Sequence, residues 1–566
     1  MKKNILLSVI SALLVVASFS PLGTGLLAWV GAVPLLFALQ GVCAEWPCGG
    51  ARKSFFLGWL WGFVFSVGTI YWVVNSMYYY GGIPLVPGAF IMLVLAAYLA
   101  LFPAFFALLF YFTADYRPLF RLFVIPALWV SLEFIKSFLF TGFPWALLGY
   151  SQAGFTTFIQ LSDIFGVWGI SYWVMLLNGG IFLFLLNLAH GSGRRGLRIE
   201  PFLIFVATAA VFIVVVVYGL VQVGSVNKET ALWPEVKVAA VQGNIGQAVK
   251  WQHSEQKKTI ARYSALIQEA SVAFDNADGV AADNNGPGLI VLPETSMPFF
   301  LARDPDMLPL VKDVARDSGS YLLIGSPDYK SDGEGGHNIL NAAFIFSPGG
   351  DITGRYDKMH LVPFGEYVPL KRILFFIEKL TAGAGEFVEG RGLYPIELEL
   401  GGVKTSVGTF ICYEAIFPSL VAELARGGPD TSADTARTAG TARTAGTART
   451  AGAARTAGLL VNITNDAWFG DTSAPHHHLD MTIMRAVENR TFLVRSANTG
   501  ISAIVSPTGE VIEKTNLFEA AVITARVGIR QGGPTFFGRF PNLFPCAALI
   551  FSAIIVILSL RLRRRY

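Results

Sequence analysis

Three residue types that together can carry out acyl transfer follow strand-like segments of this 566-residue chain. Glu294 ends the strand in GLIVLPET, Lys358 lies in RYDKMHLVPFGEYVP, and Cys412 ends VKTSVGTFIC. A carboxylate can take the proton of a thiol, and the thiolate can then attack a carbonyl carbon. An ammonium, together with the backbone N–H of Tyr413, can stabilise the oxyanion that forms. The three side chains therefore predict a site for nucleophilic acyl chemistry.

Each of these residues also has a purely structural interpretation. Free cysteines are often buried in cores, Glu294 could cap a helix, and Lys358 could be a surface charge. Cys412 is, however, the only one of the four cysteines in the polar part of the chain. The carboxyl ends of neighbouring strands in an α/β sheet also meet at one edge, where sites form. No cysteine pair has zinc-ligand spacing, so we expect no metal site.

The segments that carry these residues belong to a polar region, 229–535, in which strand-like and helix-like patterns alternate. The strand-like runs include VKVAAVQGNI, GLIVLPETS, YLLIGSP, ILNAAFIFSP and LLVNITND. Helical patterns occur between them, at 255–274, 305–318, 416–426 and 479–489. This alternation predicts a layered α/β domain.

Residues 431–458 interrupt that pattern with a low-complexity insertion. From residue 435 the sequence repeats TARTAG with a period of six and contains no aromatic or branched aliphatic residue. Such a segment cannot bury a core. We expect a flexible surface insertion without a function, the alternative being contact of its arginines with anionic lipid head groups.

The rest of the chain has the composition of a membrane protein. The whole sequence is 53% hydrophobic and 14% charged, whereas soluble domains carry about 25% charged residues. Apolar runs of about 20 residues, long enough to cross a bilayer, recur in residues 1–226 and once more in 540–566. Eight spans are predicted, at 4–20, 26–42, 54–74, 89–113, 120–140, 165–188, 201–224 and 543–560. Residues 1–20 could alternatively be a signal peptide.

The basic residues of the short loops predict an orientation. Lys or Arg precedes the first span, follows the second, fourth and sixth, and follows the last, while the opposite loops carry neither. Basic loops stay on the cytoplasmic side, so we expect both termini there and region 229–535 on the other side. Glu133 and Lys136 lie one helical turn apart inside a predicted span. They are either functional or a local pair near a helix end.

The motifs around Glu294, Lys358 and Cys412 resemble those of the nitrilase, or carbon–nitrogen hydrolase, superfamily. That resemblance implies an αββα sandwich with a Glu-Lys-Cys triad. With its spans, nearly the whole chain is similar to the bacterial apolipoprotein N-acyltransferase family, through PETSMP, KMHLVPFGEYVP, ICYE, NITNDAWFG and RAVENRTFLVRSANTGISA in this order. The predicted fold is therefore a membrane α-helical bundle of eight spans (1–226 and 540–566) plus an α/β nitrilase-like sandwich (229–535). The TARTAG insertion departs from the family but lies between its motifs.

The resemblance implies a role for each residue of the triad. Glu294 resembles the family's general base, Lys358 its oxyanion-stabilising lysine, and Cys412 its nucleophile. Four further positions match residues that support the triad or are important in the family: Glu366, Trp251, Tyr413 and Glu414. The segment NITNDAWFG also matches, although turn chemistry at the end of a strand explains its polar residues equally well.

The resemblance also implies a reaction. Cys412 would take an acyl chain from a phospholipid, usually from the sn-1 position of phosphatidylethanolamine, as a thioester. The α-amine of the N-terminal diacylglyceryl-cysteine of an apolipoprotein would then attack it, with ping-pong kinetics and no cofactor. The implied location is the bacterial inner membrane, with the catalytic domain in the periplasm and both termini in the cytoplasm. We expect a monomer, and no nucleic-acid partner.

Two other functions fit parts of the sequence. A membrane-tethered nitrilase-type amidase or hydrolase would share the fold and the triad but use water as the final acceptor. A transporter or receptor with an outward binding domain would need charges along the spans, and these contain few. Residues 371–380 (KRILFFIEKL) are amphipathic and predict an arm that dips into the outer leaflet, the alternative being an ordinary packed helix.

Overall fold

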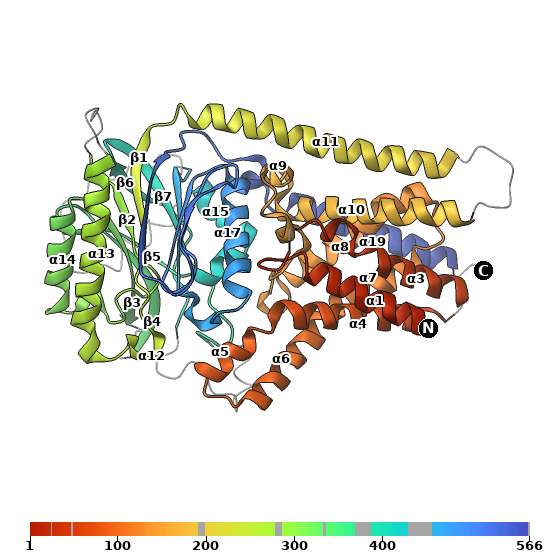
Figure 1. Cartoon of the computed structure of the whole chain (residues 1–566), viewed down its shortest axis with the longest axis horizontal. Coiled ribbons are helices and arrows are strands. Elements are labelled where there is room, and N and C mark those ends of the chain that lie inside the picture. Colours follow the sequence, from red (N-terminus) through yellow and green to blue (C-terminus); the bar gives the residue numbers. More distant parts are fainter. Residues whose placement is uncertain are drawn as a thin grey trace. The chain divides into compact units, whose positions relative to one another are not determined.

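The computed structural model describes residues 1–23, 25–46, 49–190, 199–277, 286–331, 336–367, 387–427 and 456–563. These residues form two compact units (Figure 1). The helical unit consists of Met1–Ser225, Trp468–Met484 and Phe540–Tyr566. The α/β unit consists of Val226–Ala467 and Arg485–Arg539. The predicted arm at 371–380 and nearly all of the 431–458 insertion lie outside the described residues.

Seven helical stretches of the described residues are long and apolar enough to cross a membrane: Ala28–Glu45, Ala51–Ile70, Leu85–Phe112, Pro118–Lys136, Ser162–Leu188, Ile199–Thr230 and Leu543–Leu562. They coincide with seven of the eight predicted spans. The remaining predicted span, 4–20, is occupied by α1 (Lys2–Val16), which has 15 residues. At 1.5 Å per residue this helix is about 22 Å long, and the chain continues in turns up to residue 20.

Small residues let two helices of this unit approach closely. A Cβ atom at Gly58 of α4 (Ala51–Ile70) would collide with the carbonyl oxygen of Pro103 in α7 (Leu101–Phe112). One at Gly62 would lie 2.8 Å from the Cα of Ala100. Close backbone approach at small residues is a principal way in which helices associate in lipid.

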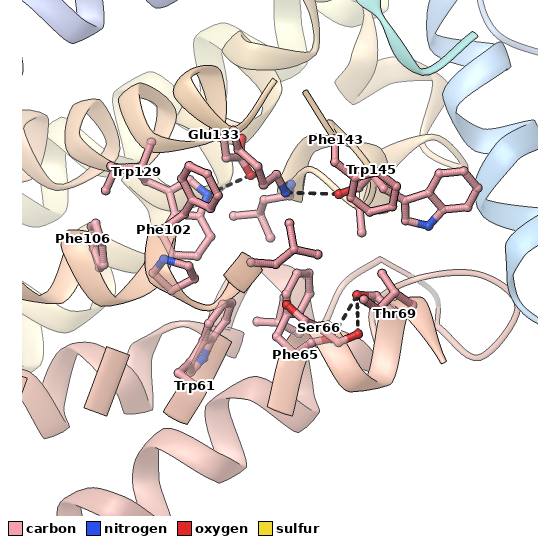
Figure 2. A pocket seen from close by; sticks show the side chains of 18 residues that line it. Trp61, Phe65, Ser66, Thr69, Phe102, Phe106, Trp129, Glu133, Phe143 and Trp145 are labelled. Carbon is pink, nitrogen blue, oxygen red and sulfur yellow. Dashed lines mark hydrogen bonds between the residues drawn. The ribbon is translucent and has the colours of Figure 1, made fainter. Parts of the chain in front are cut away.

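The two charges inside α8 (Pro118–Lys136) are bound separately by the segment that follows this helix (Figure 2). Oε1 of Glu133 accepts hydrogen bonds from Trp129 Nε1 at 3.0 Å and from the backbone N–H of Leu148 at 2.8 Å. Nζ of Lys136 donates to the carbonyl oxygen of Trp145 at 3.1 Å. Both side chains line a cavity that is otherwise mostly aromatic and aliphatic, and they hold the segment 145–148 against α8.

The α/β unit contains two six-stranded sheets. The first has the order β12 (Ala521–Gly528), β1 (Glu235–Gln242), β2 (Leu289–Val291), β3 (Tyr321–Ser331), β4 (His337–Phe346) and β5 (Ile352–Asp357). The second has the order β11 (Val511–Lys514), β10 (Ala503–Val505), β9 (Leu493–Ala497), β8 (Leu459–Thr464), β7 (Val403–Ile411) and β6 (Ile396–Leu400). Three adjacent interior strands of each sheet run parallel: β1, β2 and β3 in the first, and β7, β8 and β9 in the second. These strands are buried, as expected for apolar runs in parallel sheets.

The two sheets face each other and are covered by helices on their outer faces (Figure 1). Ser496 Oγ in one sheet donates to the carbonyl oxygen of Val241 in the other at 2.8 Å. Helices α13 (Gln256–Ala277) and α14 (Met307–Ser318) lie outside the first sheet and bury an apolar stripe against it. Helix α15 (Pro418–Arg426) packs on the second sheet beside β7. This arrangement confirms the predicted αββα sandwich.

Candidate active site

Cys412 lies at a sharp turn between a strand and a helical segment. β7 ends at Ile411, and the short 3₁₀ helix η5 (Cys412–Ile416) begins directly after it. The φ angle of Cys412 is 51°, a left-handed conformation that costs a residue with a Cβ atom of the order of 1 kcal/mol or more. The surrounding structure holds the cysteine in this conformation, at the carboxyl end of a central parallel strand.

Glu414 braces this turn. Its Oε2 accepts the backbone N–H of Ile411 at 2.7 Å, and its Oε1 accepts Tyr356 OH at 2.9 Å and the N–H of Met359 at 2.6 Å. Burial raises the pKa of Glu414 to about 7, against the opposing effect of these backbone N–H groups. Because Met359 follows Lys358, the carboxylate ties the cysteine turn to the segment that carries the lysine.

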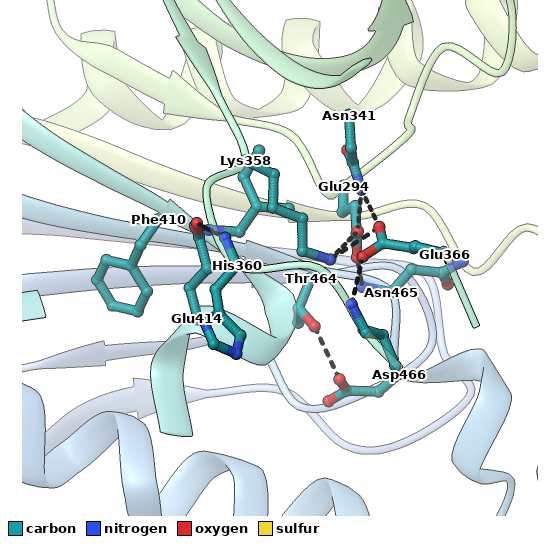
Figure 3. A network of polar contacts seen from close by, with 12 residues as sticks. Glu294, Asn341, Lys358, His360, Glu366, Phe410, Glu414, Thr464, Asn465 and Asp466 are labelled. Atoms are coloured by element: carbon teal, nitrogen blue, oxygen red, sulfur yellow. Dashed lines mark hydrogen bonds and ion pairs between the residues drawn. The ribbon is translucent and has the colours of Figure 1, made fainter. Parts of the chain in front are cut away.

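Glu294 occupies the turn after β2, and both of its carboxylate oxygens are bound (Figure 3). Oε1 accepts Asn341 Nδ2 at 2.7 Å, and Oε2 accepts the backbone N–H of Asn465 at 2.9 Å. The carbonyl oxygen of Glu294 accepts Nζ of the buried Lys250 at 3.3 Å. Burial lowers the pKa of Lys250 to about 8, while the nearby Glu294 carboxylate opposes that change.

A glycine of the neighbouring strand permits the position of the Glu294 turn. A Cβ atom at Gly325 in β3 would lie 2.5 Å from the carbonyl oxygen of Pro293 and 2.5 Å from the backbone nitrogen of Thr295. The carbonyl oxygen of Gly325 accepts the N–H of Met297 at 3.0 Å. β3 therefore supports the turn through direct backbone contact, which only glycine allows.

Lys358 follows β5 and lies between two carboxylates (Figure 3). Its Nζ is 2.9 Å from Oε1 of Glu366 and 3.5 Å from Oε1 of Glu294. Asn341 Nδ2 also donates to Oε1 of Glu366, at 3.0 Å. Burial acts to lower the pKa of Lys358, but the carboxylates of Glu366 and Glu294 outweigh it, so the pKa is raised and the side chain stays an ammonium.

Two charged neighbours, Glu294 and Lys358, affect the pKa of the Cys412 thiol. Burial raises its pKa, the Glu294 carboxylate raises it further, and the Lys358 ammonium lowers it. The net shift is upward, so the thiol stays protonated at rest although a nearby cation by itself lowers the pKa of a thiol. A thiol with a raised pKa can act as a nucleophile only with a base nearby to take its proton, and the Glu294 carboxylate lies close enough to act on this thiol.

The remaining predicted site residues lie in the same unit. Tyr413 is buried, and its ring packs edge-on against Phe417 at 5.3 Å. Burial raises the pKa of Tyr413, so its hydroxyl stays protonated. Trp251 is 46% exposed and follows α12 (Gln247–Lys250) directly. It follows Lys250, whose ammonium donates to the carbonyl oxygen of Glu294, so its half-exposed indole lies on the segment that contacts Glu294.

The segment after Asn465 contains a buried ion pair. Asp466 Oδ2 lies 2.6 Å from Arg495 NH2, and both side chains are fully buried. Oδ1 of Asp466 accepts Thr464 Oγ1 at 2.9 Å. These contacts order the end of β8, where the N–H of Asn465 meets Glu294. They support the structural interpretation of this acidic residue.

The aromatic residues of NITNDAWFG belong to the helical unit instead. The carbonyl oxygen of Trp468 accepts Asn75 Nδ2 at 3.2 Å and Ser76 Oγ at 2.7 Å. The Phe469 ring lies 4.7 Å from that of Trp72, centroid to centroid. These contacts anchor the loop that carries Trp468 and Phe469 within the helical unit.

Sequence reasoning missed Asn341 and Lys250. Asn341 was visible as a single amide in the apolar run ILNAAFIFSP, and a polar side chain in a buried strand needs a partner. Lys250 had no such signal, because its neighbour Glu294 is distant in the sequence. Among the described residues no group of three or more His, Cys, Asp or Glu side chains could hold a metal ion.

Two family models match the chain. The apolipoprotein N-acyltransferase N-terminal domain matches residues 11–180, and the carbon–nitrogen hydrolase domain matches residues 237–435 and 441–534. These matches cover the helical region and the α/β region in turn. Both parts of the fold thus resemble known domains.

Relatives of full length carry the same combination. The apolipoprotein N-acyltransferase of Geobacter metallireducens is 36% identical over 563 residues, which covers 99% of this chain and 96% of that protein. Those of Methylococcus capsulatus and Photobacterium profundum are each 30% identical, over 97% and 96% of this chain and 95% and 92% of those proteins. This chain therefore belongs to the apolipoprotein N-acyltransferase family, membrane acyltransferases of lipoprotein biosynthesis with a carbon–nitrogen hydrolase domain.

Proposed function

We propose that Cys412 carries the acyl group of the N-acyl transfer as a thioester, with Glu294 as the base. Lys358 and the backbone N–H of Tyr413 stabilise the oxyanion of each tetrahedral intermediate. The observation that supports this most directly is the convergence of the three side chains. Lys358 Nζ lies 3.5 Å from Glu294 Oε1, and both charges act on the pKa of the Cys412 thiol.

The first half-reaction takes an acyl chain from a phospholipid, for which we propose the sn-1 ester of phosphatidylethanolamine. Glu294 removes the thiol proton as the sulfur attacks the ester carbonyl carbon. Negative charge develops on the carbonyl oxygen beside the Lys358 ammonium. The carbon–oxygen bond to glycerol then breaks, the leaving oxygen takes the proton from Glu294, and a lysophospholipid departs. The acyl group remains on Cys412.

The second half-reaction passes the acyl group to an amine. The neutral α-amine of a diacylglyceryl-cysteine, at the N-terminus of an apolipoprotein, attacks the thioester carbon. Glu294 accepts a proton from the attacking nitrogen and returns it to the departing sulfur of Cys412. A thioester is a more reactive acyl donor than the amide that forms, so the step needs no cofactor. Because the lysophospholipid leaves before the amine attacks, the two half-reactions predict ping-pong kinetics.

The surrounding residues keep Glu294 able to act as a base and keep Lys358 charged. Glu366 shares the Lys358 ammonium at 2.9 Å, so that Glu294 is not the sole partner of that charge. Glu414 holds the cysteine turn through the N–H of Ile411. Trp251 is exposed enough to contact a substrate, and we propose that it does.

The α/β unit works on the periplasmic side of the inner membrane in this proposal, with both termini in the cytoplasm. The distribution of Lys and Arg among the short loops supports this orientation. Both substrates are anchored in lipid, so an enzyme held in the same membrane meets them at high effective concentration. No feature of the site requires a second subunit, and we propose that a monomer is active.

Intact-protein mass spectrometry of the purified full chain, incubated with phosphatidylethanolamine alone, tests this mechanism. We expect a mass gain of one acyl chain that is absent in Cys412→Ala and is discharged by a diacylated lipopeptide. Discharge by water as fast as by the lipopeptide would indicate a hydrolase. No adduct on folded protein would refute the assignment of Cys412 as the nucleophile.

A further inference from the structure

A cavity of about 220 Å³, lined by both apolar and polar residues, lies in the helical unit, where α1 and α4 end and α17 (Ala474–Asn489) begins. We call it the α1–α17 cavity. Its walls are formed by apolar residues such as Val16 and Phe19 and by polar residues that include Tyr71, Ser473 and His477. A water molecule takes up about 30 Å³ in the liquid, so the cavity has room for a group of several heavy atoms. None of its lining residues belongs to the Cys412 site.

Two buried polar atoms of this cavity have no hydrogen-bond partner among the described residues: Ser473 Oγ and His477 Nδ1. Ser473 is 8% exposed and His477 is 3% exposed. A hydrogen bond joins the His477 ring to the backbone of Ser20 and favours the protonated ring, so the ring is the donor. Since Nδ1 has no partner, Nε2 is the nitrogen that donates. A neutral imidazole that donates from Nε2 presents Nδ1 as an acceptor.

The charged groups around the cavity favour a cationic ligand over an anionic one. Asp471 places an exposed carboxylate at the cavity, and no lysine or arginine is among the described residues that line it. Burial lowers the pKa of His477 to about 4, the adjacent His476 also lowers it, and the bond to Ser20 opposes both. His477 is therefore neutral at physiological pH. An anionic phosphate or carboxylate would find no cation here, which makes its burial unfavourable.

A primary ammonium matches these groups. It carries one positive charge and three N–H donors, which can be shared between His477 Nδ1 and Ser473 Oγ, with the Asp471 carboxylate nearby. The hydroxyl oxygen of Tyr71 accepts the N–H of Ser473 at 3.1 Å, which fixes Ser473 at the edge of the cavity. A quaternary ammonium has the same charge but no N–H group, so it would leave both buried acceptors unpaired.

We propose that the α1–α17 cavity binds the primary ammonium of a membrane lipid. The cavity lies at the ends of two apolar helices, and Leu22 and Tyr71 on its edge are 79% and 43% exposed. Exposed apolar and aromatic side chains at such helix ends are typical of the head-group level. The ethanolamine head group of a phospholipid and the free α-ammonium of a diacylated lipopeptide share the required chemistry.

Native mass spectrometry of the full-length Cys412→Ala protein in detergent micelles tests the proposal, because that variant binds lipid without consuming it. Phosphatidylethanolamine competes with phosphatidylcholine of identical acyl chains, and the ratio of the two bound lipids is measured. We expect the double variant Ser473→Ala, His477→Phe to lower the preference for phosphatidylethanolamine about tenfold, since each variant residue removes a hydrogen bond to a charged group. Ser54→Ala, a buried hydroxyl in α4 that does not line the cavity, is the matched control.

The variants separate loss of binding from loss of the fold. Phe preserves the ring contact of His477 with Phe19, whose centroids are 5.7 Å apart. If the double variant unfolds, two single variants replace it. Ser473→Ala should lower the preference for phosphatidylethanolamine. His477→Gln keeps a hydrogen-bond acceptor and should retain that preference. An unchanged lipid ratio in folded variants would overturn the proposal.

A second arm distinguishes the two sources of the ammonium. A diacylated lipopeptide with a free α-amine competes with its N-acetylated form on the same proteins. If only the lipopeptide preference depends on Ser473 and His477, the cavity serves the lipopeptide, and if only the phospholipid preference does, it serves the head group. Because Cys412 is absent here, failure of this test is independent of whether wild-type protein forms the thioester.

Discussion

The ammonium of Lys358 lies closer to Glu366 than to Glu294. The distance from Nζ to Oε1 is 2.9 Å for Glu366 and 3.5 Å for Glu294. An ammonium paired fully with Glu294 would stabilise that carboxylate and weaken it as a base. The shorter contact with Glu366 means that Glu294 is not the main partner of the ammonium, while Lys358 still lowers the pKa of the Cys412 thiol.

Replacing Glu366 by Gln should therefore slow thioester formation. The ammonium would lose its closer partner and pair with Glu294, and the loss of general-base catalysis is expected to cost about 10²-fold. The rate at which intact protein gains the acyl mass measures the effect. Glu389→Gln, which changes an exposed glutamate of the same unit, is the control. Equal rates in the two variants would contradict the role given to Glu366.

Asn341 should be required to hold the two carboxylates together. Its Nδ2 donates to both Glu294 and Glu366, and leucine of similar size would leave those oxygens without the donor. We expect Asn341→Leu to lower the free energy of unfolding by about 1–3 kcal/mol and to slow acyl loading. Thermal unfolding and acyl loading are measured together.

The control for that variant is Asn338→Leu, on the same strand but partly exposed. A surface change of this kind should alter stability by less than about 0.5 kcal/mol. If both variants behave alike, the amide of Asn341 has no special role in the site.

Glu414 should make stability depend on pH. The pKa of Glu414 is about 7 in the folded protein, and about 4.3 is usual for an unfolded chain. A pKa that is raised on folding contributes stability that is complete below the unfolded value and is lost as the pH rises through the folded value. Between about pH 5 and pH 8 the wild type should therefore lose stability relative to Glu414→Gln, by up to about 3 kcal/mol.

The unfolding midpoints of the two proteins across this pH range measure the difference. Glutamine cannot titrate, so groups common to both proteins cancel in the comparison. A difference that stays constant with pH would show that the carboxyl of Glu414 does not titrate in this range.

Adding one methyl group at Gly325 should displace the Glu294 turn. The new Cβ atom would meet backbone atoms of Pro293 and Thr295 at 2.5 Å, and neither can move without the turn. Overpacking of this kind costs about 1–3 kcal/mol. We expect Gly325→Ala to unfold at a lower temperature and to load acyl groups more slowly, while Gly349→Ala, where the nearest atom is 3.5 Å away, should behave as wild type.

The structure confirms the parts of the fold that rest on local patterns. Alternating strands and helices in 229–535 predicted the sandwich, and seven of the eight apolar runs coincide with helices long enough to span a membrane. The first predicted span, 4–20, overlaps α1, which ends at Val16. The seventeen residues Trp468–Met484 escaped prediction as part of the helical unit, since their partners, such as Asn75, are almost 400 positions earlier.

The amino-acid sequence by itself determined that the chain is a membrane protein with an α/β domain, and that Glu294, Lys358 and Cys412 follow strand segments. Composition and periodicity are local properties, so they can be determined from the sequence without knowledge of long-range contacts. Only the tertiary structure decided that Asn341 joins two carboxylates, and that burial with Glu294 raises the pKa of the thiol despite Lys358. Those outcomes depend on distance and on exclusion of water, which arise when strands far apart in the sequence come together in two packed sheets.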